Sequence, residues 1–367
     1  MSLALLAAAL WSFQQPAPVA APSWLPHLAP PVQLHADGVP LDVVEFHGHA
    51  APLLADISGD GLPELLVGVA RGQIARYTNL GTRAAPRWSF DGLLEVKGQP
   101  VKVESASSGG ISLDLADLDG DGDGDLVVAS SDGLVHWLEG YTKQRFAMLQ
   151  PLRDKSRLPL RLGRYYHYGK LDWEVDEKNP YDALRGISAS AVDWDADGDL
   201  DLLLGASEGR VVLRINEGRS KRYSFANKSV AIEVAGAPFE VPGGQARPIA
   251  VDWDGDGLFD VLSGSADGAV HAWRNVGEVG VPRFAEATRI LDSAKDRAAR
   301  AAQEQGGTPT PSGPFQSARL HACDYDGDGD LDLLLGDAQH GEPPPGSEKK
   351  VLVRGHVWLL RREPVAK

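Results

Sequence analysis

Residues 252–261 read DWDGDGLFDV, and the same ten-residue pattern recurs in four other places along the chain. Every copy has Asp at positions 1 and 5, Gly at position 6, an acid at position 9, and Leu or Val at position 10. Self-similar segments at long intervals are typical of proteins built from structural repeats. The other copies are DISGDGLPEL at 56–65, DLDGDGDGDL at 117–126, DWDADGDLDL at 193–202 and DYDGDGDLDL at 324–333.

The sequence around each copy repeats as well and has the pattern of short strands. A short apolar segment precedes each loop, as in RPIAV at 247–251, and a continuous apolar run follows it, as in DLLLGAS at 201–207. A second apolar segment comes next, and in three copies an Asn-x-Gly turn then follows. Short apolar runs bounded by turn residues indicate an all-β architecture.

A third shared piece predicts how the repeats close into a ring. The segments 34–43, 94–103 and 232–241 each read as a strand, a Gly-x-Pro turn and a second strand. The first of them precedes the first loop, whereas the last repeat ends soon after its third strand, at 361–363. The N-terminal segment therefore supplies the missing outer strand of the last repeat, which removes an open sheet edge. We predict a β-propeller with five blades of four antiparallel strands, closed by this N-terminal strand.

The acids of these loops are spaced so that they can surround one cation. Calcium takes six to eight oxygen ligands, and carboxylates on alternate residues of a tight loop can converge on one point. We expect ligands from the side chains at positions 1, 3, 5 and 9 and from the carbonyl at position 7, while Gly at position 6 permits a positive φ. The chain would thus hold up to five Ca²⁺ ions. The expected side-chain ligands are Asp56, Ser58, Asp60 and Glu64; Asp117, Asp119, Asp121 and Asp125; Asp193, Asp195, Asp197 and Asp201; Asp252, Asp254, Asp256 and Asp260; and Asp324, Asp326, Asp328 and Asp332.

Other interpretations of the loops are possible. An EF-hand requires Glu at position 12 and flanking helices, and magnesium is disfavoured because a cage of five protein ligands suits the larger calcium shell. Solvated Asp/Gly turns without an ion are the open alternative. The first loop is the weakest candidate because Ser58 replaces a carboxylate. In place of the EF-hand Glu, position 12 holds Val67, Val128, Leu204, Ser263 and Leu335.

Together these motifs resemble the FG-GAP/VCBS repeat family, whose calcium loops are similar to those of the integrin α-subunit propeller. The resemblance extends over most of residues 24–367 and rests on the Asp-x-Asp-x-Asp-Gly-x-x-Asp loops with the apolar strands that follow them. It implies a propeller fold and bound calcium. It implies no single activity, because the family is functionally mixed.

Composition and the N-terminal segment restrict the class of protein. A net charge of −15 without a basic stripe argues against a nucleic-acid partner. Residues 3–13 are apolar but too short to span a membrane, and with the Pro/Ala-rich stretch 16–22 they resemble a secretory signal, a disordered tail being the alternative. We therefore expect a signal-like segment at 1–23, one propeller at 24–367, no membrane span, and a secreted, periplasmic or cell-surface location. The abundance of calcium outside cells favours the same location.

Two insertions lengthen the connections between repeats, at about 151–184 and about 291–314. Both lie between the outer strand of one blade and the inner strand of the next, so we expect both on the face opposite the loops. The first holds Arg164, Tyr166 and His167 in an aromatic and basic cluster, and the second has the composition of a short surface helix. Aromatic rings stack on sugars and Arg or His binds carboxylates, but such aromatics can equally pin a long loop to the propeller.

The sequence favours a recognition or adhesion module that binds a glycan or an extracellular protein. The rival is a polysaccharide lyase-like enzyme that uses Arg164, Tyr166 and His167. Arg247 and Arg319, which each precede a loop by five residues and are expected near the axis, would support that activity. No pair of carboxylates stands apart from the loop acids, which argues against an enzyme. A third alternative is a purely structural unit without a small ligand.

Overall fold

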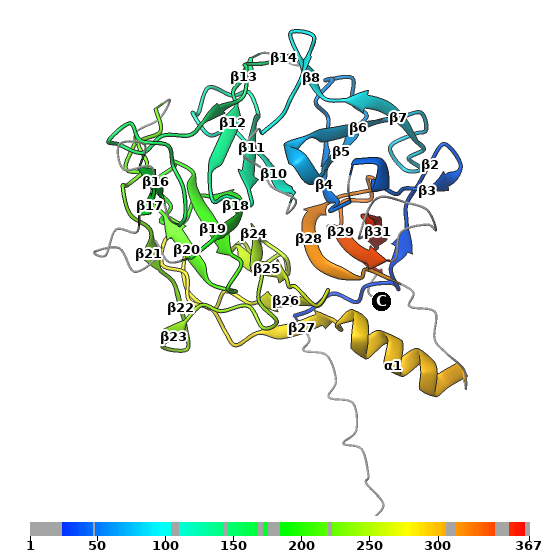
Figure 1. Ribbon diagram of the computed structural model, residues 1–367. Coiled ribbons are helices and arrows are strands. Elements are labelled where there is room, and N and C mark those ends of the chain that lie inside the picture. Colours follow the sequence, from blue (N-terminus) through cyan, green and yellow to red (C-terminus); the bar gives the residue numbers. More distant parts are fainter. Residues whose placement is uncertain are drawn as a thin grey trace, which may run out of the picture.

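Five sheets stand around a common axis as the blades of a propeller, and Figure 1 shows them in a view roughly along this axis. Each blade has four antiparallel strands, and its inner strand lies next to the axis. The predicted all-β fold with five blades is confirmed. The signal-like segment 1–23 lies outside the described residues. The computed structural model describes residues 24–46, 48–103, 110–141, 145–163, 165–167, 172–174, 184–218, 222–305, 313–341 and 352–363.

Blades 1 to 4 are each continuous in sequence and run from the inner strand to the outer strand. Blade 1 consists of β4 (Ala51–Ala55), β5 (Glu64–Gly68), β6 (Ile74–Asn79) and β7 (Trp88–Leu93). Blade 2 consists of β10 (Ile111–Ala116), β11 (Asp125–Ser130), β12 (Val135–Leu138) and β15 (Gln150–Pro151). Blade 3 consists of β18 (Gly186–Val192), β19 (Asp201–Ala206), β20 (Val211–Arg214) and β21 (Val230–Ala231). Blade 4 consists of β24 (Arg247–Val251), β25 (Asp260–Gly264), β26 (Val270–Trp273) and β27 (Thr288–Leu291).

Blade 5 combines strands from both ends of the described chain. Its four strands are β28 (Gln316–Cys323), β29 (Asp332–Gly341), β31 (Val357–Leu360) and β1 (Val32–Gln33). The outer strand β1 pairs antiparallel with β31, and the N–H of Leu34 extends this pairing by donating to the Val357 carbonyl at 2.8 Å. The predicted ring closure is confirmed, although the closing strand lies mostly just before the predicted segment 34–43.

Most of segment 34–43 forms a small hairpin outside blade 5, and segments 94–103 and 232–241 do the same after blades 1 and 3. The two turn residues have positive φ in each case, for example 51° at Ala235 and 78° at Gly236. Two consecutive residues with positive φ are the geometry of a type I′ hairpin turn. The hairpin strands are β2 (His35–Ala36) and β3 (Val39–Pro40), β8 (Glu95–Val96) and β9 (Gln99–Pro100), and β22 (Glu233–Val234) and β23 (Ala237–Pro238).

A repeated Gly near the end of the second strand lets neighbouring blades approach closely. An alanine Cβ at Gly264 would lie 2.1 Å from the carbonyl oxygen of Ala318 in the next blade, and one at Gly336 would lie 2.1 Å from that of Ala50. Such short distances exclude any side chain. The buried Leu and Val residues beside these glycines fill the layers between blades, so the DLLLG motif serves both strand formation and blade packing.

The remaining elements lie in the connections between strands. The predicted helix of the second insertion is α1 (Ala294–Gln305), and Ser293 caps it by accepting the Asp296 N–H on its Oγ at 3.1 Å. No helix in the described part of the chain is long and apolar enough to cross a bilayer. The other short elements are η1 (Val44–Phe46), η2 (Ala70–Gly72), β13 (Gly140–Tyr141), β14 (Arg145–Phe146), β16 (Tyr165–His167), β17 (Asp172–Glu174) and β30 (Leu352–Arg354).

Candidate metal centres

All five acidic loops join the inner strand of a blade to its second strand, so they lie at one end of the propeller and are flanked by strands rather than helices. Each loop is closed by its own carboxylates. In blade 2, Asp117 Oδ2 accepts the Gly122 N–H at 3.0 Å and Asp121 Oδ1 accepts the Asp123 N–H at 2.9 Å. The Gly at position 6 has φ between 90° and 99° in all five loops, which confirms the predicted turn.

The acid at position 9 joins the loop to the third strand of its blade. In blade 4, the fully buried Asp260 accepts the Trp253 N–H on Oδ2 at 3.2 Å and the Asn275 N–H on Oδ1 at 2.7 Å. Burial raises the pKa of Asp260 to about 6 and that of Asp201 to about 7. The sequence predicts only a metal ligand at position 9 and gives no signal of this second role, because the donors are backbone N–H groups, as Gly140 shows in blade 2. The same pair of backbone bonds holds Asp125, Asp201 and Asp332.

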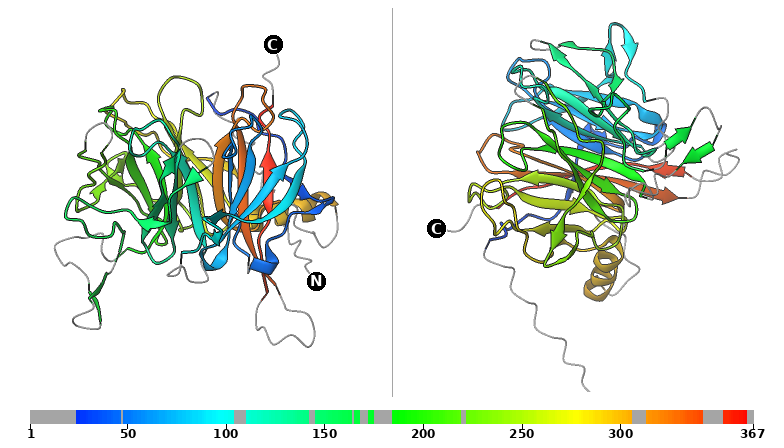
Figure 2. Two further views of the ribbon diagram at one scale, coloured as in Figure 1. Left: turned by 90° about the horizontal axis from the view of Figure 1, so that it is seen from above. Right: turned by 90° about the vertical axis from the view of Figure 1, so that its left-hand side faces the viewer.

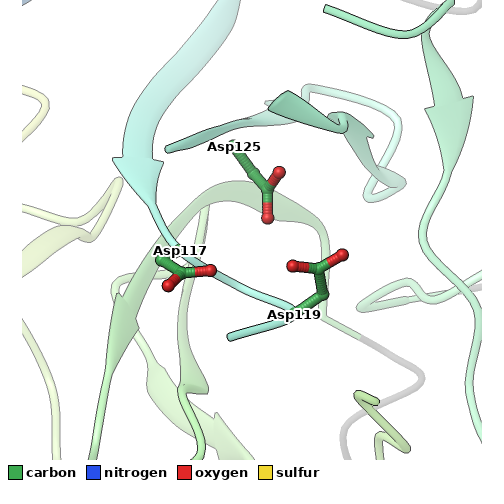
Figure 3. A group of neighbouring side chains, drawn as sticks. All are labelled: Asp117, Asp119 and Asp125. Atoms are coloured by element: carbon green, nitrogen blue, oxygen red, sulfur yellow. The ribbon is translucent and has the colours of Figure 1, made fainter. Parts of the chain in front are cut away.

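In four of the five loops, three carboxylates converge so that one oxygen of each lies within 4.8 Å of the others. Figure 3 shows the carboxylates of Asp117, Asp119 and Asp125 facing a common point. Asp193 Oδ1 and Asp326 Oδ1 are buried and have no hydrogen-bond partner among the described residues. An anionic, oxygen-only donor set with unpaired buried oxygens fits a hard dication such as Ca²⁺. The other three sets are Asp193, Asp195 and Asp197; Asp252, Asp254 and Asp260; and Asp324, Asp326 and Asp328.

The first loop differs from the other four. Its acids form no comparable set of three within the described residues. Ser58 Oγ donates to Asp56 Oδ1 at 3.4 Å, and Glu64 Oε2 accepts the Ile57 N–H at 3.0 Å. Glu64 therefore contacts the loop backbone as the other position-9 acids do, but the loop offers fewer carboxylates to a cation.

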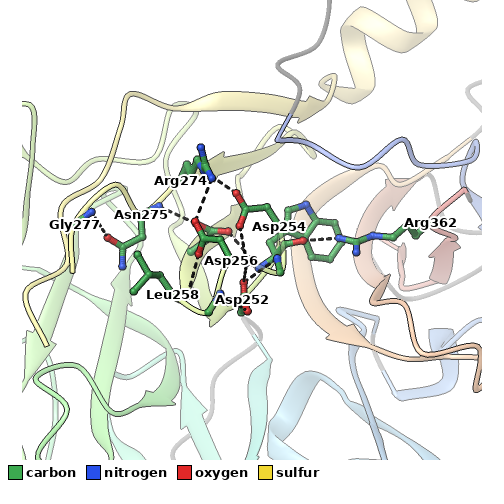
Figure 4. A network of polar contacts seen from close by, with 12 residues as sticks. Asp252, Asp254, Asp256, Leu258, Arg274, Asn275, Gly277 and Arg362 are labelled. Atoms are coloured by element: carbon green, nitrogen blue, oxygen red, sulfur yellow. Dashed lines mark hydrogen bonds and ion pairs between the residues drawn. The ribbon is translucent and has the colours of Figure 1, made fainter. Parts of the chain in front are cut away.

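An arginine contacts the carboxylate cluster of blade 4. Arg274 directly follows β26, and its Nε lies 2.6 Å from Asp254 Oδ2 while its Nη2 lies 3.1 Å from Asp256 Oδ2. Figure 4 shows this side chain reaching over the loop. The protein itself thus supplies part of the positive charge that these acids require.

The residue that corresponds to Arg274 differs between blades. In blade 5, Arg361 Nη1 lies 3.1 Å from Asp326 Oδ2, which repeats the arrangement of blade 4. The residues at this place are Glu139 in blade 2 and Ile215 in blade 3. The clusters of blades 2 and 3 therefore lack the arginine that partly neutralises the clusters of blades 4 and 5.

The first insertion carries candidate recognition residues at the opposite end of the propeller. β16 and β17 pair as a separate hairpin, with Tyr166 opposite Trp173 and His167 opposite Asp172. Figure 2 shows this hairpin extending beyond the blades at the end away from the acidic loops. Arg164 lies outside the described residues, so its predicted grouping with Tyr166 and His167 stays a prediction.

The two arginines expected near the axis are found there. Arg247 begins β24 and Arg319 lies in the first half of β28, and with Ser112 and Ser188 they line a narrow cavity among the inner strands. Inner strands begin at the end opposite the loops, so this cavity belongs to the end that carries the β16–β17 hairpin. Both arginines are buried.

Comparison with known proteins identifies the repeats. A profile described as FG-GAP-like repeat matches residues 56–128 and 252–335. No curated protein sequence matches the chain. Similar solved structures include an alpha-L-arabinofuranosidase from Podospora anserina in complex with cellotriose, with 13% identity, a TM-score of 0.46 and coverage of 94% of this chain and 100% of that chain. Another is the catalytic domain of an alpha-L-arabinofuranosidase from Coprinopsis cinerea, with 12% identity, a TM-score of 0.48 and coverage of 94% and 99%. Likenesses of this size carry no information about activity; the chain is a β-propeller that carries FG-GAP-like repeats at residues 56–128 and 252–335.

Proposed function

We propose that this protein is an exported, calcium-binding β-propeller that serves as a recognition or adhesion module for a glycan or a protein partner. The convergence of three carboxylates in each of four loops carries the calcium part of this proposal. Carboxylates brought this close repel one another in the absence of a cation. A bound dication balances that charge, so the loops favour calcium as a structural component of the blades.

The residues that would hold the ions belong to the loops of blades 2 to 5. In blade 3, Asp193, Asp195 and Asp197 offer carboxylate oxygens, and one of them, Asp193 Oδ1, is buried without a hydrogen bond from any described residue. Calcium bound there would supply positive charge and fix the loop conformation. Several oxygen ligands from one short loop suit the flexible calcium shell better than the octahedral shell of magnesium.

Export follows from the same sites together with the apolar N-terminal segment. Calcium loops of modest affinity fill where calcium is abundant, which is outside the cytosol. The proposed location is therefore secreted, periplasmic or cell-surface. Fractionation of cells that express the full chain tests this, since recovery only in the cytosol would contradict it.

The recognition surface is assigned to the end opposite the loops. A rigid propeller with a protruding hairpin is a common arrangement for binding, because loops on a stable scaffold carry most binding residues. The β16–β17 hairpin holds Tyr165, Tyr166 and Trp173, and aromatic side chains suit sugar rings as well as protein partners. Enzymatic activity is not part of this proposal.

Equilibrium dialysis of the full chain against calcium, followed by metal analysis, tests calcium binding. We expect one ion for each carboxylate cluster, no displacement by an equal concentration of magnesium, and the loss of one ion in Asp193→Asn. A chain that stays metal-free at millimolar calcium, the range of weak extracellular sites, would refute the proposal.

A glycan array probed with the calcium-loaded full chain tests recognition. Tyr166→Ala with His167→Ala should remove binding without changing the melting temperature. Tyr141→Ala is the matched control, because Tyr141 is an exposed tyrosine on a hairpin at the loop end. Equal loss of binding in both variants would exclude the hairpin as the recognition surface.

A further inference from the structure

Two arginines are buried near each other at the end of the axis opposite the loops. Arg247 is 7% exposed and Arg319 is 3% exposed, and both line the narrow axial cavity. Burial, and then the positive charge of Arg319, lower the pKa of Arg247 well below its usual value. Arg319 has the negative charge of Asp337 nearby, but the two guanidinium groups are buried close together, which is costly unless further counter-charge is present.

Arg247 has a hydrogen-bond donor that no described residue uses. Its Nη2 donates to Gln245 Oε1 at 3.3 Å, but its buried Nε has no hydrogen-bond partner among the described residues. Gln245 is neutral, and its Oε1 also accepts the hydroxyl of Ser317 at 2.9 Å. No carboxylate in the described ranges forms an ion pair with Arg247. Its charge is therefore not balanced by a described acid.

His49 and Gly110 adjoin the same cluster. The buried Nδ1 of His49 has no hydrogen-bond partner among the described residues. Burial and the charges of Arg319 and Arg247 lower the pKa of His49 to about 3, so the imidazole is neutral at physiological pH and one ring N–H can donate. A Cβ at Gly110 would lie 3.1 Å from His49 Cβ and 3.5 Å from Arg319 Nη2, which places the three residues next to one another.

We propose that this axial mouth binds a small oxyanion, of the carboxylate or sulfate class, between Arg247 and Arg319, with His49 as a further donor. Guanidinium groups present planar arrays of donors that match such anions. The cavity volume of about 20 Å³ is that of one water-sized group, so a single oxygen of the anion enters the cavity and a sugar ring does not. The anion is a free ion or the acidic group of a larger molecule, and its binding does not rest on the proposed function.

Thermal unfolding of the calcium-loaded full chain tests the site, with sodium acetate titrated into Tris chloride buffer at constant ionic strength. We expect a saturable rise in melting temperature for the wild type. For Arg247→Met, the apparent affinity for acetate should be lower by roughly tenfold or more. Because Arg247→Met removes one of two buried like charges, it should also melt above the wild type when acetate is absent. Arg71→Met is the control, since it removes an exposed arginine at the same end and should leave the response unchanged.

A wild-type response that does not saturate, or one that Arg247→Met shares, would overturn the proposal. Arg247→Lys keeps the charge but loses the planar array of donors, so acetate should still raise its melting temperature, but by less than in the wild type. This variant replaces Arg247→Met in the test if Arg247→Met does not fold. Acetate and an oligogalacturonate are then compared at equal carboxylate concentration. Tighter binding of the oligomer identifies an acidic group of a larger ligand, and equal or weaker binding identifies a free ion.

Discussion

The two ends of the propeller concentrate charge of opposite sign in different ways. At the loop end, each cluster of carboxylates comes from one short segment, such as Asp193 to Asp197. At the axial mouth, Arg247 and Arg319 come from different blades and meet only because inner strands surround a common axis. A local cluster can be recognised in the sequence as a motif, whereas a cluster made by ring geometry becomes visible only in the fold. In both places the like charges favour an ion of the opposite sign.

Removal of calcium should have the largest effect on stability, and it should affect the loop end without changing the axial mouth. A ligand at about 100 times its dissociation constant stabilises a protein by about 2.7 kcal/mol per site, so occupied clusters in four loops would contribute on the order of 10 kcal/mol. We expect excess chelator to lower the melting temperature by roughly 10–20 °C in calorimetry. The rise in melting temperature that acetate causes should persist in the calcium-free protein. If chelator left the melting temperature unchanged, the loops would be solvated turns.

Single-loop variants should separate the first loop from the others. Asp193→Asn removes one carboxylate from a complete cluster and should cost about 2–3 kcal/mol of unfolding free energy in saturating calcium. Asp56→Asn, in the loop without such a cluster, should cost less than about 1 kcal/mol. Urea unfolding measures both values. Equal losses of unfolding free energy would show that calcium stabilises the first loop as much as it stabilises the third.

Arg274 offers a test in which the direction of the effect depends on calcium. Its contacts with Asp254 and Asp256 substitute for part of a cation's charge. Because ion pairs of a solvent-accessible arginine contribute little, Arg274→Met should destabilise the calcium-free protein only slightly and should tighten calcium binding in blade 4. Arg361→Met should repeat this result in blade 5, where the contact recurs. Calorimetric titration measures the affinities, and weaker binding in both variants would mean that the arginines support the ion.

The fold and the loops were predictable from sequence because their determinants are local. The spacing of Asp, Gly and apolar residues specifies each strand–loop–strand unit, and the incomplete last repeat predicts closure by the N-terminal strand. The exact closing strand was less predictable. Segment 34–43 was expected to supply it, but β1 ends at Gln33, and a type I′ turn at Asp37 folds most of that segment into a separate hairpin.

Contacts between segments account for what sequence alone did not predict. The position-9 acids accept backbone N–H groups from the end of the third strand, as Asp260 does from Asn275, and the motif does not reveal that partner. Arg274 reaches its loop from the same strand end. The Nε of Arg247, which has no partner in the described part of the chain, results from packing around the axis, and no spacing of residues encodes this.

Ala196 should give the smallest effect and tests whether the loop end is formed before calcium binds. At position 4 of the third loop its φ is 60°, whereas the other four loops have Gly there with φ between 70° and 81°. Since a positive φ strains any residue with a Cβ, Ala196→Gly should stabilise the protein by about 0.5 kcal/mol, a gain reduced by the greater freedom of Gly in the unfolded chain. Ala299→Gly, in α1, is the control of opposite sign and should cost about 1 kcal/mol. Urea unfolding with and without calcium then distinguishes two cases. An equal gain in unfolding free energy with and without calcium means that the fold itself brings the carboxylates together, as it does the arginines at the axial mouth. A gain only with calcium means that the ion orders the loop.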